Sequence, residues 1–301
     1  MQPAPARFYA RIDHEHGCRH LLCAFNSYDC PAQGRETRLQ NSKWLLTYGL
    51  STLWFAEADA DAGSRTWFTG FDFEIQQWLR HAIRFQGIER VTFLGSSLGG
   101  YASIRHALLL GDEPGLAAVS AFAVNPQTGF DEPLMDDIRA AMRRVNWRAA
   151  DLGGHPILPR RQDLCAAPDS VPESDLLALA RSVPESGKAR LELFYDARNP
   201  IEAGFSERMA PLPGVTLHPY ELGLPHGAGA KHMLLSGRLR NHMDEHLGLW
   251  PEGRGQRPVL AQPAVPDPAV PKADPAATSA ALAGEFERAW RAATGRTREA
   301  A

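Results

Sequence analysis

The chain has 301 residues, of which 44% are hydrophobic and 22% charged, ordinary values for a globular protein with a sizeable core. A formal net charge of −3 offers no basic surface for nucleic acid and no broad attraction to a membrane. No segment approaches the roughly 20 consecutive apolar residues of a membrane span. Residues 1–7 lack the pattern of a signal peptide, so we expect a cytoplasmic protein.

Strand and helix patterns follow one another through the first 125 residues. Apolar runs predict strands at 7–13, 20–25, 51–55, 90–94 and 116–124. Helices are expected near 36–47 and over 72–86 and 98–110, with Asp72 and Gly87 bounding the second helix. The cysteines are Cys18, Cys23, Cys30 and Cys165. Because they form no C-x-x-C pair, we expect free thiols.

Residues 126–188 interrupt this alternation. They are too many for a plain crossover between strands, and an insertion of this size commonly forms a lid or shapes the substrate site. Helical patterns occur in it near 133–144 and 173–182. Strands at 189–195 and 215–220 and a helix at 232–247 complete the series. The order predicts an α/β fold, with a mainly parallel sheet, helices on both faces and a lid-like insertion before the next-to-last strand.

The chain changes character after residue 250. Seven prolines fall between Pro251 and Pro275, which predicts an extended linker over 251–278. Residues 279–293 place Leu282, Phe286 and Trp290 along one side of a helix. We expect one domain over 1–250, the linker, and an amphipathic helix with its tail over 279–301. We expect this helix either to dock back on the domain or to bind something else, a protein partner or a second copy of the chain.

The segment V-T-F-L-G-S-S-L-G-G-Y at 91–101 carries the chemistry. Gly95-Ser96-Ser97-Leu98-Gly99 fits G-x-S-x-G directly after a predicted strand and at the start of a predicted helix. In such a turn the serine is exposed at the sheet edge. The glycines two residues to either side let neighbouring backbone pass without a clash. No Gly-Lys-Ser/Thr follows that would hold a nucleotide phosphate.

This segment resembles the nucleophile elbow of the α/β-hydrolase superfamily, close to the G-S-S-M-G-G-Y form of bacterial esterase-like members. The resemblance covers about residues 7–250. It implies a serine hydrolase with Ser97 as nucleophile, acting on a small-molecule carboxylic ester or thioester. Water resolves the acyl-enzyme, so the resemblance implies neither a metal nor an organic cofactor. The triad order is then serine, acid, histidine.

Two acids follow the strand at 189–195, in F-Y-D-A-R-N-P-I-E-A-G-F. The superfamily's commonest spacing would place the acid at Asn199, which cannot carry the required negative charge. Relatives with an acid further on, before a helix, favour Glu202. Asp196 lies closer to the strand end and either serves as the acid or braces the loop.

Two histidines follow the strand at 215–220. We favour His232 as the base because it opens the final helix after flexible small residues. His226 lies earlier in the same loop and is the alternative, whereas His218 falls inside the strand and is expected to be structural. An oxyanion hole needs two backbone N–H groups. Leu98 would supply one and, by the resemblance, Asn26 or Ser27 the other.

Three alternatives accompany this hypothesis. His242 to His246 matches the H-x-x-E-H pattern of some zinc peptidases, but an apolar stripe on the same helix favours packing and no third ligand is indicated. The fold can also persist without catalysis, as a scaffold whose C-terminal helix binds a partner. If an alcohol or sugar replaced water, the same triad would make the protein an acyltransferase.

Overall fold

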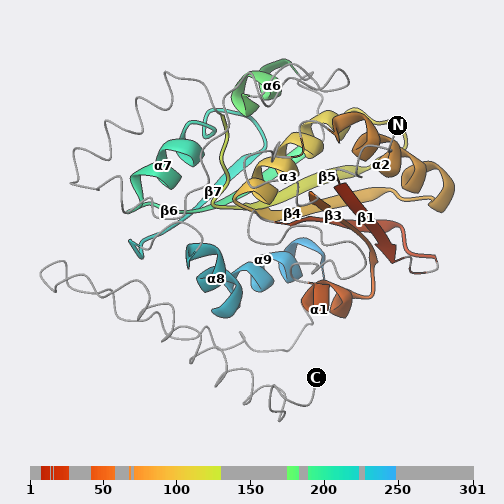
Figure 1. The fold of residues 1–301 in the computed structure, drawn as a ribbon, viewed down its shortest axis with the longest axis horizontal. Coiled ribbons are helices and arrows are strands. Elements are labelled where there is room, and N and C mark those ends of the chain that lie inside the picture. Colours follow the sequence, from red (N-terminus) through yellow and green to blue (C-terminus); the bar gives the residue numbers. More distant parts are fainter. Residues whose placement is uncertain are drawn as a thin grey trace, which may run out of the picture. The chain divides into compact units, whose positions relative to one another are not determined.

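The computed structural model describes residues 8–13, 15, 17–26, 42–57, 68, 71–129, 175–182, 189–223 and 228–248. Within them, seven strands form one sheet in the order β1-β3-β2-β4-β5-β6-β7 (Figure 1). The strands are β1 (Phe8–Asp13), β2 (His20–Phe25), β3 (Ser51–Glu57), β4 (Arg90–Ser96), β5 (Ala118–Val124), β6 (Ala189–Asp196) and β7 (Val215–Tyr220). Strands β2 to β7 pair in parallel, and β1 runs antiparallel to β3 at the edge.

The described helices are α1 (Ser42–Leu45) with the 3₁₀ turn η2 (Leu46–Tyr48), α2 (Asp72–Gln86), α3 (Leu98–Leu110), α6 (Leu176–Ser182), α7 (Pro200–Glu207), α8 (Ala228–Leu235) and α9 (Arg238–His246). Helices α2, α3 and α6 lie on one side of the sheet (Figure 1). None of these helices is long and apolar enough to cross a membrane. The chain divides into two compact units, and the whole sheet belongs to the first, which ends at Ala230.

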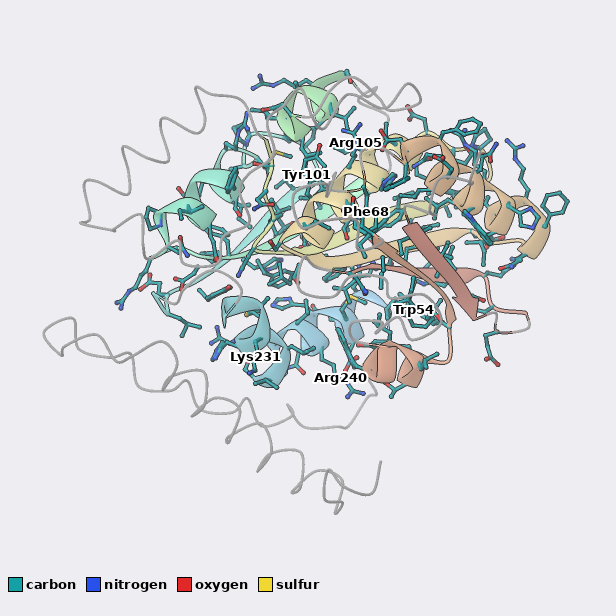
Figure 2. All side chains as sticks on the ribbon, viewed as in Figure 1. Trp54, Phe68, Tyr101, Arg105, Lys231 and Arg240 are labelled. Carbon is teal, nitrogen blue, oxygen red and sulfur yellow. The ribbon has the colours of Figure 1, made fainter. Side chains whose placement is uncertain are left out.

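The core lies between the sheet and helices α2, α3 and α6. Strands β2 and β3 are buried along nearly their whole length, as expected of strands covered on both faces. Phe25 is the centre of an aromatic cluster: its ring stacks on Phe55 at 5.1 Å and on His106 at 5.3 Å, and meets the edge of Phe68 at 5.0 Å. Trp54 and Phe68 are fully buried (Figure 2). Burying one such side chain contributes roughly 1.5–3 kcal/mol, so this cluster anchors the strands beneath the elbow.

The mainly parallel sheet and most predicted elements are confirmed. Two differences have clear physical reasons. The strands at 8–13 and 20–25, although consecutive in the chain, do not pair with each other, because β2, apolar apart from His20, takes an interior place between β3 and β4. The helix predicted over 232–247 is split into α8 and α9, since Gly237 has φ 75° and cannot continue a right-handed helix.

Several predictions fall outside the described residues. They include Cys30, Cys165, most of the insertion, the linker at 251–278 and the amphipathic helix at 279–293. From the insertion, only 126–129 and 175–182 are described, and α6 agrees with the helix expected near 173–182. Cys18 and Cys23 are free thiols. Burial raises the pKa of the Cys23 thiol, so this group stays protonated.

Candidate active site

Ser97 stands at the turn between β4 and α3 with φ 53° and ψ −117°. A non-glycine residue there has a strained backbone, which persists only when its surroundings hold it in place. Its N–H donates to the Val124 carbonyl at 2.9 Å, and its carbonyl accepts from the Tyr101 N–H at 3.0 Å. The serine is thereby fixed to β5 and to the first turn of α3, whose positive end lies beside it.

The glycines of the motif are required by close backbone contacts. A Cβ on Gly95 would overlap the Gly99 carbonyl, and a Cβ on Gly99 would overlap the Phe25 carbonyl. A Cβ on Gly100 would lie 3.2 Å from the Cα of Pro126. The motif therefore needs glycine at these positions because α3 begins directly against the ends of β2 and β5.

The oxyanion candidates differ in how their N–H groups are used. Leu98 is the first residue of α3, where a helical N–H has no partner within the helix. The Asn26 N–H donates to the Phe55 carbonyl at 2.9 Å and so continues the pairing of β2 with β3. Ser27 lies outside the described residues. The sheet therefore already uses the Asn26 donor.

Both candidate acids are buried and lie together at the end of β6. The Asp196 Oδ1 accepts from the N–H groups of Arg198 at 3.0 Å and Leu222 at 3.1 Å. Glu202, in the first turn of α7, accepts from the Asp196 N–H through Oε2 at 2.9 Å. Burial raises the pKa of Glu202 well above its ordinary value, and the neighbouring Asp196 charge raises it further, against the Asp196 N–H bond. Burial therefore favours the neutral form of the Glu202 carboxyl group.

The acid segment also holds an element that the sequence analysis did not resolve. Asn199 caps α7, because its Oδ1 accepts from the N–H groups of Ile201 at 3.0 Å and Glu202 at 3.4 Å. Pro200 occupies the first helical position. Asparagine followed by proline is a recognised helix start, so this signal was present in the sequence.

Strand order brings Ser97 and the acids to one sheet edge. Ser97 follows β4 and Asp196 ends β6, so the two are separated by β5, a span of about 10 Å. His232 lies on α8 in the second compact unit, where it is buried and its carbonyl accepts from the Ser236 N–H at 2.8 Å. His226 lies outside the described residues.

The remaining histidines have structural surroundings. His218 lies in β7, where its Nε2 bonds to the Glu192 Oε2 at 2.7 Å and its ring stacks on Phe194 at 4.4 Å. On α9, the helix of His242 and His246, the apolar side chains of Leu239 and Met243 are buried. No group of three potential ligands that could hold a metal occurs among the residues that the structure describes.

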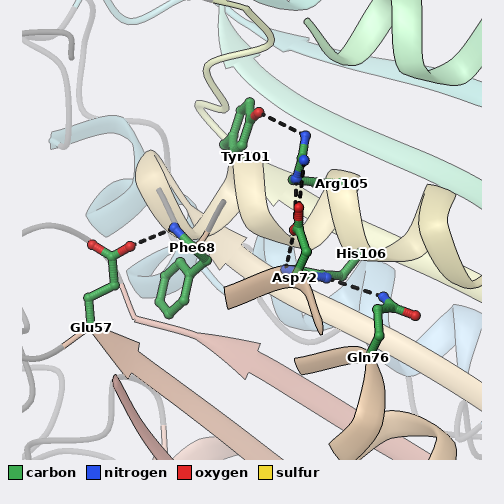
Figure 3. Close-up of polar contacts among 7 residues, drawn as sticks. All are labelled: Glu57, Phe68, Asp72, Gln76, Tyr101, Arg105 and His106. Atoms are coloured by element: carbon green, nitrogen blue, oxygen red, sulfur yellow. Dashed lines mark hydrogen bonds and ion pairs between the residues drawn. The ribbon is translucent and has the colours of Figure 1, made fainter. Parts of the chain in front are cut away.

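A buried polar network joins α2 to α3, the helix that starts at the elbow (Figure 3). Arg105 donates to both carboxylate oxygens of Asp72, at 2.9 and 2.7 Å, and to the Tyr101 hydroxyl at 3.3 Å. The Gln76 amide contacts His106 Nδ1 at 3.2 Å. Apolar periodicity gives no sign of such a network, because its members come from helices about 30 residues apart. It fixes the direction of α3 behind Ser97.

This network predicts a loss of stability in acid. Burial lowers the pKa of His106 to about 4 from 6.5, against the Asp72 charge. Between these two pH values the His106 imidazole binds a proton in the unfolded chain but not in the folded chain. The free energy of unfolding therefore falls as the pH falls from about 6.5 to 4. At about 1.4 kcal/mol per pH unit, the loss amounts to a few kcal/mol. Urea unfolding at pH 7 and pH 5 measures it.

His106→Asn provides the control. Its side-chain oxygen can replace Nδ1 as the acceptor for Gln76, but it does not titrate. The variant should be less stable at pH 7 and lose less stability than the wild type on acidification. An equal loss in both proteins would assign the acid sensitivity to other groups.

Comparisons with known proteins find similarity in the fold. No protein-family model and no curated protein matches the sequence. Among solved structures, the capsule O-acetyltransferase of Neisseria meningitidis serogroup A is similar with a TM-score of 0.50 and 14% identity, over 79% of this chain and 91% of that one. A lipase-esterase related protein from Clostridium acetobutylicum has a TM-score of 0.47 and 13% identity, over 81% of this chain and 99% of that one. An esterase from Pyrococcus furiosus has a TM-score of 0.45 and 16% identity, over 78% of this chain and 85% of that one.

The strand order, the elbow backbone and the first of these similarities define the class of protein. The chain has the α/β-hydrolase fold. An identity of 14% shows that fold and no particular reaction.

Proposed function

We propose that the protein is a serine hydrolase that cleaves a small-molecule carboxylic ester or thioester through an acyl-enzyme on Ser97. The observation that carries the proposal is the strained backbone of Ser97 between β4 and α3. A turn that served only packing would be built from glycine at such a position. A serine held there presents its hydroxyl at the sheet edge, beside the N-terminus of a helix.

In the proposed reaction His232 accepts the Ser97 proton as Oγ attacks the carbonyl carbon. The N–H groups of Leu98 and Ser27 stabilise the resulting oxyanion; Ser27 is preferred to Asn26 because the Asn26 N–H is bonded in the sheet. The C–O or C–S bond then breaks, and the leaving group takes the proton from His232. Water repeats the attack on the acyl-enzyme, which releases the acid and restores the serine.

We propose Asp196 as the acid that orients His232, with Glu202 as its support. Asp196 is held at the strand end by two backbone N–H groups, and a charged carboxylate stabilises an imidazolium. Glu202, whose pKa burial raises, is the poorer partner for a positive charge. The resemblance to esterase-like relatives favoured Glu202, and the contacts around the two carboxyl groups support the other assignment.

Isosteric amides distinguish the two acids. Asp196→Asn is expected to lower kcat by about 10⁴-fold, because an amide favours the wrong histidine tautomer. Glu202→Gln should lower it only a few-fold, since an amide oxygen can still accept from the Asp196 N–H. Both variants are compared by kcat for an activated ester and by thermal unfolding. A severe loss in Glu202→Gln with a mild one in Asp196→Asn would assign the acid to Glu202.

Two measurements test the proposed function itself. A fluorophosphonate probe should label the wild type, and a scaffold without catalysis would stay unlabelled. A series of esters and thioesters of increasing acyl length, with and without alcohol or sugar acceptors, then separates the reactions. Release of free acid in the presence of acceptors indicates hydrolysis, whereas an acylated acceptor as the main product indicates an acyltransferase.

A further inference from the structure

Two buried polar side chains meet beside the elbow, across the ends of β5 and β7. The hydroxyl of Tyr220, the last residue of β7, donates to the Asn125 Oδ1 at 2.6 Å. Asn125 follows β5 with φ 49°, and its N–H donates to the Phe194 carbonyl at 2.7 Å. The preceding carbonyl, of Val124, is the acceptor for the Ser97 N–H. The pair is thus fixed to the same strand end as the proposed nucleophile.

The first turn of α8 packs directly on this pair. A Cβ on Gly229 would overlap the Tyr220 hydroxyl and lie 3.0 Å from the Asn125 Nδ2. Only glycine lets the helix backbone come so close. Gly229, Tyr220 and Asn125 all belong to the first compact unit, and α8 continues from Gly229 through His232.

The pair presents a fixed donor to the helix. Oδ1 of Asn125 accepts the hydrogen bond from the Tyr220 hydroxyl. The other end of the amide, Nδ2, is therefore the end near Gly229. Nδ2 is buried and has no hydrogen-bond acceptor among the described residues. A buried donor without an acceptor lowers stability, and such groups are concentrated at functional sites. Burial raises the pKa of Tyr220, and the neighbouring carboxyl groups of Glu202 and Asp196 raise it further, so the hydroxyl donates at every working pH.

We propose that Asn125 and Tyr220 are positioning residues that set the first turn of α8, and through that helix the position of the base His232. The inference rests on the proposed function, because it requires His232 to act as the base. Asn125 and Tyr220 take no part in proton transfer. They determine where the helix starts against the sheet, and Gly229 is the contact through which they do so.

The test is a rescue experiment on the full chain, with 4-nitrophenyl acetate as the probe substrate. Gly229→Ala should push α8 away and lower kcat by about 100-fold with little change in KM, as a displacement of about 1 Å does. Tyr220→Phe alone should cost a few-fold. In the double variant the overlapping hydroxyl is gone, so kcat should recover by about ten-fold over Gly229→Ala, a coupling expected only of groups in contact.

Tyr195→Phe is the matched control. It also removes a tyrosine hydroxyl near the end of the sheet, one that donates to the Glu207 Oε1 at 3.2 Å and not to Asn125. It should leave the activity of the wild type unchanged and give no recovery in the Gly229→Ala background. Equal recovery by both tyrosine variants, or losses that simply multiply in the double variant, would overturn the inference.

A second variant covers the case in which Gly229→Ala does not fold. Asn125→Gly tolerates the left-handed backbone and removes the whole side chain, with its amide. It should lower kcat by about ten-fold and shift the acid limb of the pH–rate profile; an unchanged kcat and profile would overturn the positioning role. A wild type with neither turnover nor fluorophosphonate labelling overturns the proposed function and this inference together. If the wild type is active and Gly229→Ala leaves kcat unchanged, the inference alone is overturned.

Discussion

Replacing Ser97 with alanine is expected to lower the turnover of an activated ester by about a million-fold and to abolish labelling by a fluorophosphonate. The loss is large because the serine oxygen forms the covalent intermediate, and no neighbouring group can take its place at the turn. The fold should survive. The backbone of residue 97 is held by hydrogen bonds to Val124 and Tyr101 that do not involve the side chain. The thermal midpoint should therefore stay within a few degrees of the wild type.

Ser96 provides the control for this substitution. It is the last residue of β4, chemically identical and adjacent, yet it lies within the strand and not at the strained position. Ser96→Ala should keep both labelling and turnover. If the probe still labels Ser97→Ala, or labels Ser96 in that variant, the nucleophile is not Ser97. The two variants together test whether reactivity follows the backbone geometry or merely the presence of a serine.

The elbow could be predicted from sequence because its constraints are local. Gly95 is required by a backbone contact with Gly99, four residues on, and the spacing of the motif appears directly in the chain; the contact of Gly99 with Phe25 on β2 is the one distant constraint. Helix α2 was equally accessible, since its apolar residues recur with helical period. The sheet order was not, because β1 and β3 pair across about 40 residues by a choice that apolar patterns do not encode.

The candidate site was harder to predict than the fold. The Tyr220–Asn125 bond joins residues 95 positions apart, and nothing in either local sequence indicates the other. The acid presents a different difficulty, because Asp196 and Glu202 are both suitable by type and by position. What separates them is their contacts in the folded chain: Asp196 accepts from the N–H groups of Arg198 and Leu222, whereas Glu202 accepts from the Asp196 N–H. The Asn199 cap, by contrast, is visible in the sequence as asparagine followed by proline, a pattern that predicts the start of α7.

Replacing His232 with alanine is expected to cost nearly as much kcat as replacing Ser97, by at least about 10⁵-fold. The members of a triad act as a unit, so a serine without its base is almost as inert as no serine at all. The double variant should consequently be no slower than Ser97→Ala. Added imidazole should restore part of the activity of His232→Ala and none of the activity of Ser97→Ala, because only the former retains a nucleophile to be deprotonated.

Comparison with His226→Ala decides which of the two histidines is the base. Both histidines follow β7 in the same connection, and a base must come within about 2.6–3.2 Å of the serine hydroxyl, so only one of them can serve. If His232 is the base, His226→Ala costs at most a few-fold and imidazole has no effect on it. If His226→Ala is the severe variant and responds to imidazole, the base lies before α8 in the chain. In that event the positioning role of Asn125 and Tyr220 also fails, because that role depends on a base carried by the helix.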